Sequence, residues 1–527
     1  MPPIVLILVA VLAVVAAMTL LAPRLHVPPP ILLACAGVAL AFVPGIHRQR
    51  LSPDLILIGF LPPLLYADAF ATSWRDFQRW LRPITMLAVG LVAATILSVG
   101  LVAHQVMPDL PWSACFLLGA VVSPTDTVAV QSVLERLRIP RRMTAVLGGE
   151  SLVNDATGLV GVQLGVAVVL QGAFSTGAML GRFVWVAGVG IGVGVTVGAL
   201  AALLNRRVRE APVLFTLSLL APYLAYVTAL ELEASGVLAV VASGFLVAWR
   251  IHHIPSQSRV RLYAGWEFLE FLLNGFCFVY IGMEAPYVLR LMADSGECRL
   301  WAGLLVSGAV IATRVLWCLP MAYLPLWLWP RLRAREGGYP PLRSVLVVSW
   351  CGVRGAVSLA AALALPAIDN EGFPFPGRDA IEACTLAVIL CTLLLQGLTL
   401  HPLVKLLRIP DDPGTEEEAR RAREQVLQAG IARLDAFCSE HSCPVAVHRY
   451  REAMADQLAA LEATDAAVRS EAAQRLAVSQ EVRREVHAAQ EAALLLLRNR
   501  GQINDQLYSE LLLELDRLGI DGHGASE

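Results

Sequence analysis

The segment Gly149-Glu150-Ser151-Leu152-Val153-Asn154-Asp155 puts two acids and an amide inside a long apolar stretch of the chain. A charge at the centre of a bilayer costs roughly 3 kcal/mol on insertion scales, so each such residue needs a partner or a function. Glu150 fits a structural ion pair between helices as well as it fits a functional role. Asp155 has no evident cation near it in the sequence, and this favours a functional role for its carboxylate.

The composition identifies the class of protein. Hydrophobic residues make up 57% of the chain and charged residues 16%, which is far from the balance of a soluble domain. Apolar runs of about 18 to 28 residues, bounded by Arg, Pro or Gly, are long enough to cross a bilayer as helices. We therefore expect an all-α polytopic membrane protein with about thirteen spans, near residues 4–22, 27–45, 52–71, 81–105, 112–134, 143–170, 177–204, 212–230, 235–250, 264–289, 299–327, 343–366 and 380–404.

Basic residues set the expected orientation, because cytoplasmic loops are enriched in Arg and Lys. The loops near 105–111, 171–176 and 230–235 contain neither, although Arg48 and Arg50 break the alternation once. With thirteen spans, the N-terminus then lies outside and the C-terminus lies in the cytoplasm. We expect the protein in the inner membrane of the cell. The first span lacks a basic leader and a small-residue cleavage site, so we interpret it as a retained helix. The basic loops contain Arg75, Arg79 and Arg82; Arg136, Arg138, Arg141 and Arg142; Arg206, Arg207 and Arg209; and Arg331, Arg333, Arg335 and Arg343.

A polar tail follows the last span, so we divide the chain into a transmembrane domain, 1–410, and a cytoplasmic helical domain, 411–527. Helical spacing of apolar residues, with charges on the other face, predicts helices over 416–437, 447–461 and 468–497 and a short one over 503–518. A solvated cap without chemistry and a regulatory or dimerisation module are both consistent with this pattern.

Other kinds of chemistry find little support in the sequence. Most cysteines lie in apolar spans, where a thiol behaves as a small apolar side chain, and no disulfide framework is implied. The tail residues Cys438, His441, Cys443 and His448 match no zinc spacing, and there is no metalloprotease or phosphate-loop motif. The glycine-rich run 188–198 lies in a span, where close helix packing explains it better than a nucleotide. We therefore expect neither a cofactor nor an enzyme, and no nucleic-acid partner.

Polar groups at mid-span define the candidate site. Ser123-Pro124-Thr125-Asp126-Thr127 puts a proline inside the fifth span, which removes a backbone hydrogen bond and frees carbonyl groups near Asp126. Broken helices at mid-membrane are how transporters coordinate ions. In the sixth span Ser151 and Asp155 are four residues apart, so they share one helical face, and Glu150 and Asn154 share the next.

Buried cations supply the other half of the pattern. In the twelfth span Gly352-Val353-Arg354-Gly355 surrounds an arginine with two glycines that loosen the helix. Arginine keeps its charge and needs a carboxylate, and we expect Glu150 to be that partner; Arg314 in the eleventh span is the other central cation. Asp68 in the third span either snorkels to the cytoplasmic end or contributes to the site.

Together these motifs resemble the monovalent cation/proton antiporters, in the Asn-Asp branch that holds bacterial NhaP-type sodium/proton antiporters and animal sodium/proton exchangers. The resemblance covers essentially the whole membrane region and rests on five motifs in order: Phe60 to Phe70, Gly119 to Val130, Glu150 to Asp155, Phe268 to Gly282 and Gly352 to Leu359. Two positions depart from the family pattern, which usually has Pro at position 127 and an acid at position 67.

The resemblance implies an inverted-repeat fold of thirteen helices, some of them discontinuous, and a homodimer in the lipid bilayer. It makes Asp155 the main ion and proton ligand, with Asn154 beside it. Ser151, Asp126 and the backbone carbonyl of Thr125 complete the Na⁺ site, and Glu150 and Arg354 form a structural ion pair.

The expected mechanism is exchange by competition. A proton and a hard, oxygen-preferring cation compete for the carboxylate of Asp155, and if only loaded states cross, a rocking core moves cation one way and proton the other. We expect electroneutral exchange of one monovalent cation, Na⁺ with Li⁺ or K⁺ as candidates, for one proton. The alternatives are a K⁺-preferring antiporter, a channel-like or sensor protein on the same scaffold, and a membrane enzyme.

Overall fold

A computed structural model describes residues 3–25, 27–43, 55–134, 139–171, 176–294, 297–368, 372–409, 413–440 and 445–462, with short pieces between 485 and 512. The chain separates into two compact units, Met1–Asp411 and Asp412–Glu527. We describe each unit by itself. Among the residues predicted to form loops or tail helices, Arg48, Arg50, Arg136 and Arg138, all of 468–484 and most of 503–518 lie outside the described residues.

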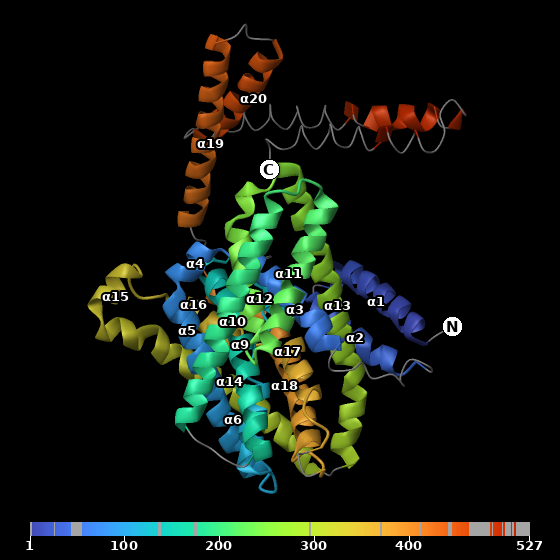
Figure 1. The fold of residues 1–527 in the computed structure, drawn as a ribbon, viewed down its shortest axis with the longest axis vertical. Coiled ribbons are helices and arrows are strands. Elements are labelled where there is room, and N and C mark those ends of the chain that lie inside the picture. The colour runs from blue at the N-terminus through green and yellow to red at the C-terminus, as the bar shows by residue number, and fades with distance from the viewer. Residues whose placement is uncertain are drawn as a thin grey trace. The chain divides into compact units, whose positions relative to one another are not determined.

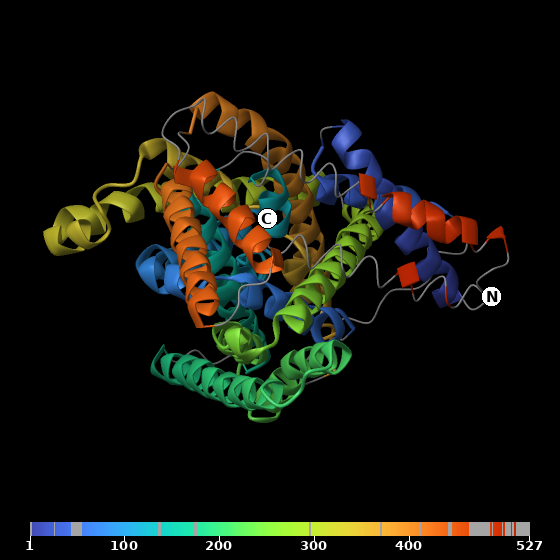
Figure 2. The ribbon, with the colours of Figure 1, turned by 90° about the horizontal axis from the view of Figure 1, so that it is seen from above.

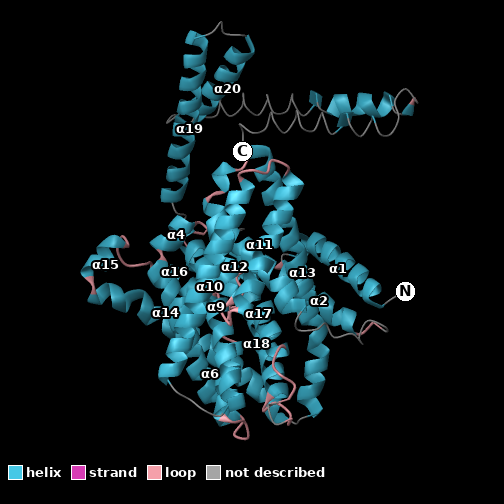
Figure 3. Ribbon diagram, viewed as in Figure 1, coloured by secondary structure: helices cyan, strands magenta, loops and turns pink. Residues whose placement is uncertain are grey.

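The first unit is a bundle of helices (Figures 1 and 3). Within the described ranges its only β feature is an isolated bridge between Ile368 and Pro374. The elements are α1 (Pro3–Leu25), α2 (Pro29–Ala41), the π-helical turn η1 (Leu55–Phe60), α3 (Leu61–Ala71), α4 (Trp74–Arg79), α5 (Leu81–Thr85), the π-helical turn η2 (Met86–Leu91), α6 (Val92–Val106), α7 (Trp112–Val121), α8 (Val128–Leu134), α9 (Arg141–Gln171), α10 (Thr176–Asn205), α11 (Ala211–Glu231), α12 (Gly236–Trp249), the 3₁₀ turn η4 (Ile251–His253), α13 (Ser256–Asp294), α14 (Glu297–Leu328), α15 (Pro330–Arg335), α16 (Leu342–Trp350), α17 (Ala356–Leu363) and α18 (Arg378–Leu407).

The helices confirm a polytopic membrane protein. Eight of the described helices are long and apolar enough to span a bilayer. Shorter apolar helices occupy Pro29–Ala41, Leu57–Ala71, Trp112–Val121 and Gly236–Trp249, and the pair α16 and α17 falls on the expected twelfth span. Each of the thirteen expected spans therefore coincides with a helix or a broken helix, while the number that cross the membrane stays a prediction.

Two of these spans are broken, as the mid-span proline and glycines predict. α7 ends at Val121 and α8 begins at Val128, with Pro124 between them, because proline cannot donate a backbone hydrogen bond and disfavours helix at the preceding residue. α16 ends at Trp350 and α17 begins at Ala356, and Gly352 and Gly355 lie in this second gap. The sequence thus places two stretches of non-helical backbone inside the bundle.

Glycines let α10 pack directly on α12. A Cβ atom on Gly190 would lie 2.7 Å from the carbonyl oxygen of Ser235, one on Gly194 would lie 2.1 Å from that of Ala239, and one on Gly198 would lie 2.9 Å from that of Ser243. This is the small-residue stripe that lets helix backbones approach each other in a membrane, and it confirms helix packing as the reason for the glycine-rich run. α10 and α11, in teal and green, run along one edge of the bundle (Figure 2).

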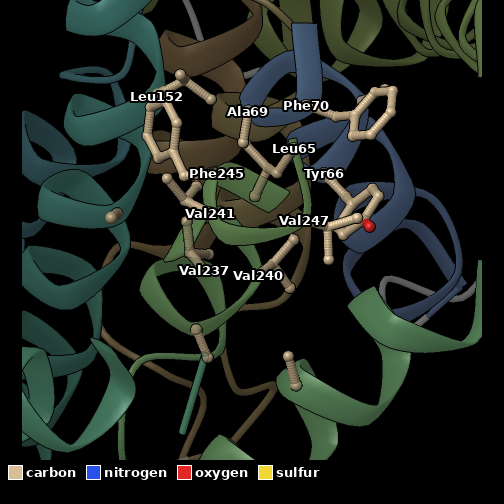
Figure 4. Close-up of a cluster of buried hydrophobic side chains, with 14 of the residues drawn as sticks. Leu65, Tyr66, Ala69, Phe70, Leu152, Val237, Val240, Val241, Phe245 and Val247 are labelled. Carbon is tan, nitrogen blue, oxygen red and sulfur yellow. The ribbon is translucent and has the colours of Figure 1, made fainter. Parts of the chain in front are cut away.

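α12 links this edge to the helices that form the candidate site. Figure 4 shows Phe245 and Val241 of α12 beside Leu152 of α9, and Val240 and Val247 on the side of Tyr66 of α3. All of these side chains are buried in one apolar cluster, where van der Waals packing between the helices stabilises their arrangement. Since Leu152 lies inside the acid-bearing segment of α9, the cluster fixes the helix that carries the candidate ligands.

The second unit contains the helices α19 (Pro413–Glu440) and α20 (Val445–Glu462), which match the first two predicted tail helices. Hydrogen bonds from Arg420 and then Arg421 lower the pKa of Glu417 to about 2, so these exposed pairs stay charged at neutral pH. Cys438 is disulfide-bonded, so the tail contains a bridge although the sequence implies no disulfide framework. This cysteine lies in the polar tail and not in an apolar span, so the argument from buried thiols does not apply to it.

Candidate functional site

The two broken spans meet at Asp126. Its backbone N–H donates to the carbonyl oxygen of Val353 at 2.8 Å, so the second break satisfies a donor that the first break exposes. Its carboxylate Oδ1 accepts from the N–H of Val128 at 2.9 Å, at the start of α8. A Cβ atom on Gly355 would lie 1.7 Å from Oδ2 of Asp126, so only glycine lets the two segments approach this closely.

A cavity of about 50 Å³ lies beside this crossing; we call it the site cavity. Asp155 lines it and is only 6% exposed, and its Oδ1 has no hydrogen-bond partner in the described part of the chain. A buried carboxylate oxygen without a partner is costly unless something binds it. The polar residues around the cavity are Asp68, Thr125, Asp126, Thr127, Ser151, Asp155, Asn274 and Ser358. Their side chains offer carboxylate, hydroxyl and amide oxygen atoms as ligands, a set that suits a hard cation.

Thr125 connects the first break to α9. The hydroxyl of Ser151 donates to the Thr125 carbonyl oxygen at 3.1 Å, and Nδ2 of Asn154 donates to the Thr125 hydroxyl oxygen. That hydroxyl in turn donates to Oε1 of Glu150 at 3.3 Å. Ser151, Thr125 and Asp155 therefore meet at the site cavity, while Asn154 acts through Thr125 and is not one of the cavity-lining residues.

The expected ion pair between Glu150 and Arg354 is wrong, because Glu150 pairs with a different arginine. Glu150 binds Arg314 of α14 through both carboxylate oxygens, one of them at 2.8 Å from Nη2, and both side chains are 1% exposed. Arg354 instead donates from Nε to the Val122 carbonyl at 2.6 Å and from Nη1 to that of Gly352 at 3.1 Å. The two breaks leave these carbonyls without helical partners, and the Arg354 guanidinium satisfies them.

Asp68 lies between the site and a larger opening. It lines the site cavity and also a second cavity of about 560 Å³, the access cavity, whose other residues include Asp76, Gln131, Arg141 and Glu270. Arg141 and Asp76 form an ion pair at 2.8 Å within this wall. The access cavity therefore adjoins the site cavity at Asp68 and includes Arg141, a residue of one of the basic loops.

Two polar contributors to the site did not emerge individually from the sequence. Asn274 of α13 and Ser358 of α17 line the cavity, and both fall inside motifs that carry the family resemblance. Gly355 is needed for the approach to Asp126. A polar residue in an otherwise apolar span is the signal that could have indicated Asn274, since α13 runs Phe271-Leu272-Leu273 before it and Gly275-Phe276-Cys277 after it.

Two helix breaks that contact each other around buried carboxylates, in a bundle of apolar helices, are typical of an ion-coupled secondary transporter. The family model described as the sodium/hydrogen exchanger, transmembrane, matches residues 8–406 of the chain. The chain therefore belongs to the sodium/hydrogen exchanger family, and it is a multi-pass membrane protein that transports ions.

Similar proteins cover most of the chain. An uncharacterised Na⁺/H⁺ exchanger of Mycobacterium tuberculosis is 36% identical over 518 residues, which is 97% of this chain and 94% of that protein. A sodium, potassium, lithium and rubidium/H⁺ antiporter of Bacillus subtilis is 33% identical over 388 residues, or 71% of this chain and 57% of that protein. The sodium proton antiporter MjNhaP1 of Methanocaldococcus jannaschii shares the fold, with a TM-score of 0.61 at 20% identity over 77% of this chain and 98% of that one.

Proposed function

We propose that the protein exchanges Na⁺ for H⁺, one for one, by competition at Asp155. The observation that supports this most directly is the unpartnered, buried Oδ1 of Asp155 beside Ser151 and Asp126. A carboxylate in this position is satisfied by a proton or by a hard cation, and it cannot hold both. Competition for one group then couples the two flows.

The arrangement of the cavities supports alternation between two states. The site cavity and the access cavity share Asp68 and Thr127. A third cavity of about 340 Å³, lined by Gln163 of α9 and Tyr226 of α11, shares no described residue with the site cavity. We infer that the access cavity faces the cytoplasm, because it contains Arg141 of a basic loop. The cation then reaches Asp155 from inside in this state and from outside after the core rocks.

The proposed stoichiometry follows from the charges on α9. Position 154 is an amide, so α9 brings a single carboxylate to the cavity. The chain contains one lysine, Lys405, at the end of the last span, so no intramembrane lysine carries an extra proton. Asp126 already accepts a hydrogen bond from the α8 backbone, which assigns its charge a structural use. One carboxylate that releases one proton per cation gives electroneutral exchange.

The oxygen ligands of the site are consistent with a preference for Na⁺ or for K⁺. The relative of Bacillus subtilis is named for sodium, potassium, lithium and rubidium, so a K⁺-preferring antiporter is the second candidate. A channel-like protein is less well supported, since a channel needs a continuous polar path, and the small cavity that adjoins the site cavity at Phe60, Cys277 and Ala356 is lined by apolar and aromatic side chains. We infer further that the protein works as a homodimer in the cell membrane, with the N-terminus outside and the C-terminus in the cytoplasm.

The proposal is tested in proteoliposomes that hold a proton gradient reported by a pH-sensitive dye. Adding Na⁺, Li⁺ or K⁺ separately should dissipate the gradient for the transported cations, because each cation bound displaces a proton. Asp155→Asn, which keeps the shape and removes the titratable group, should abolish dissipation by every cation while the protein remains folded. Dissipation at the wild-type rate by Asp155→Asn would disprove the competition mechanism, and cation flux without proton movement would favour a channel.

A further inference from the structure

Two residues line both the site cavity and the access cavity: Asp68 and Thr127. They come from α3 and from the first helix break. We call this pair the neck. Since these residues mark where the two cavities adjoin, a cation that moves from the access cavity to Asp155 meets their side chains before the main ligand.

The Thr127 side chain is largely buried, but its hydroxyl makes no hydrogen bond to a described residue. Thr127 is 7% exposed. Its backbone carbonyl accepts from the N–H groups of Val130 at 3.0 Å and Gln131 at 2.7 Å, which begins α8. Its hydroxyl, in contrast, has no hydrogen-bond partner among the described residues. The hydroxyl oxygen is not one of the fully buried side-chain atoms that lack a partner, so it is accessible to water or to an ion in the adjoining cavities.

A purely structural role explains the hydroxyl poorly. Threonine at the start of a helix normally accepts a hydrogen bond from a backbone N–H of the first turn. Here the carboxylate of Asp126 accepts from Val128 N–H, and the Thr127 hydroxyl makes no such bond. The other threonine in the break, Thr125, uses its hydroxyl to bind Glu150. Thr127 is therefore the one hydroxyl of this break that is left for a ligand.

The change in volume at the neck defines what such a ligand needs. The access cavity holds about 560 Å³ and the site cavity about 50 Å³, so a hydrated cation loses water as it passes. Protein oxygen atoms at the constriction replace part of the lost hydration. Asp68 supplies the charge that draws in a cation, and a neutral hydroxyl adds a ligand without holding the cation too tightly to leave.

We propose that the Thr127 hydroxyl is a transit ligand: with Asp68 it holds a partly dehydrated monovalent cation at the neck, one step before Asp155. The inference rests on the proposed exchange function and adds a second station to it. It predicts that the affinity for cation presented from the access-cavity side depends on this hydroxyl, while the turnover of a loaded site does not.

The experiment compares exchange in everted membrane vesicles, in which the cytoplasmic face meets the bath. Thr127→Val keeps the shape and removes the hydroxyl, and it should raise the KM for Na⁺ about five- to tenfold, the effect of losing one such polar ligand, with a maximal rate close to wild type. Thr127→Ser keeps the hydroxyl and should match wild type. Thr157→Val is the matched control, because the Thr157 hydroxyl already donates to the Val153 carbonyl at 2.9 Å.

The outcomes separate this inference from the proposed function. An unchanged KM in Thr127→Val, or an equal rise in Thr127→Ser, would overturn the transit ligand. If Thr127→Val fails to fold by gel filtration, Thr127→Ala removes the same hydroxyl with less volume and carries the same expectation. Asp155→Asn in the same vesicles tests exchange itself: if it stays active, the proposed function fails, whereas its inactivity beside an unaffected Thr127→Val removes only the neck.

Discussion

Glu150 of α9 and Arg314 of α14 form a bidentate ion pair in which each side chain is 1% exposed. The same carboxylate accepts a hydrogen bond from Thr125, so α14 holds the first helix break through α9. Neither charge contacts water, and each depends on the other for its solvation. The pair therefore belongs to the framework that aims Thr125 and Ser151, and it lies apart from the carboxylate that we propose exchanges ions.

Breaking this pair should cost more than removing it. Glu150→Ala or Arg314→Ala alone strands a buried charge and should destabilise the protein by about 3 to 5 kcal/mol, whereas the double variant should be less destabilised than either single one. Thermal unfolding in detergent measures the three shifts. The exposed pair Arg182 and Glu233, with side chains 51% and 72% exposed, is the control and should contribute less than about 1 kcal/mol. Additive shifts for Glu150 and Arg314 would contradict the coupling.

Gly355→Ala should disable transport by displacing Asp126. The added Cβ would lie 1.7 Å from the Asp126 carboxylate, so the two breaks must separate, and a shift of about 1 Å at a reacting centre can lower a rate about a hundredfold. Proteoliposome exchange rates measure the loss. Gly308→Ala in α14 is the control, since nothing lies within 4 Å of its added Cβ, and it should keep the wild-type rate. Normal exchange by Gly355→Ala would show that the close approach is dispensable.

Exchange should have a bell-shaped pH profile. At low pH protons hold the carboxylate against the cation, and at high pH the return step lacks protons. Because the two ligands compete one for one, a tenfold rise in Na⁺ should move the acid limb about one pH unit lower. Initial rates at several Na⁺ concentrations measure the shift. An acid limb that ignores Na⁺ would indicate a separate pH sensor, for which the helices of the second unit are the candidate.

The exchange should be insensitive to voltage. Moving one elementary charge through 100 mV corresponds to about 2.3 kcal/mol, so any net charge per cycle changes the final ratio of the Na⁺ and H⁺ gradients. A potassium–valinomycin potential on vesicles with fixed ion gradients, with Na⁺ as substrate, measures this ratio. A ratio that follows the potential would show that Asp126 or another acid also releases a proton in each cycle.

The membrane spans were predictable because lipid tolerates only long apolar helices. The breaks were predictable because Pro124 removes a helical hydrogen bond and Gly352 loosens the helix. The partner of Glu150 was not predictable. Arg314 and Arg354 are both central and both buried, and the choice between them depends on which guanidinium faces α9. That orientation is set by the carbonyls of Val122 and Gly352, which the two helix breaks leave without helical partners and which accept from Arg354 in the folded bundle.

Asn154 is a second example of this limit. Its helical position puts it beside Asp155, and the sequence offers no reason to separate the two functions. The structure directs its amide to Thr125, so its contribution to the site is one of positioning. Spacing along a helix identifies which side chains share a face of that helix. Which residue of another segment they contact depends on the conformation of that segment, here the first helix break.

Cys277 of α13 lines the site cavity opposite the helix breaks and is 6% exposed. It gives the protein a native chemical reporter of the direction in which the cavity opens. The site cavity adjoins the access cavity at the neck, so a small thiol reagent that enters through the access cavity would reach this cysteine from one face of the membrane. As the core alternates, the face from which Cys277 reacts should alternate with it. The extent of modification from each side would then report the populations of the two access states without an engineered cysteine.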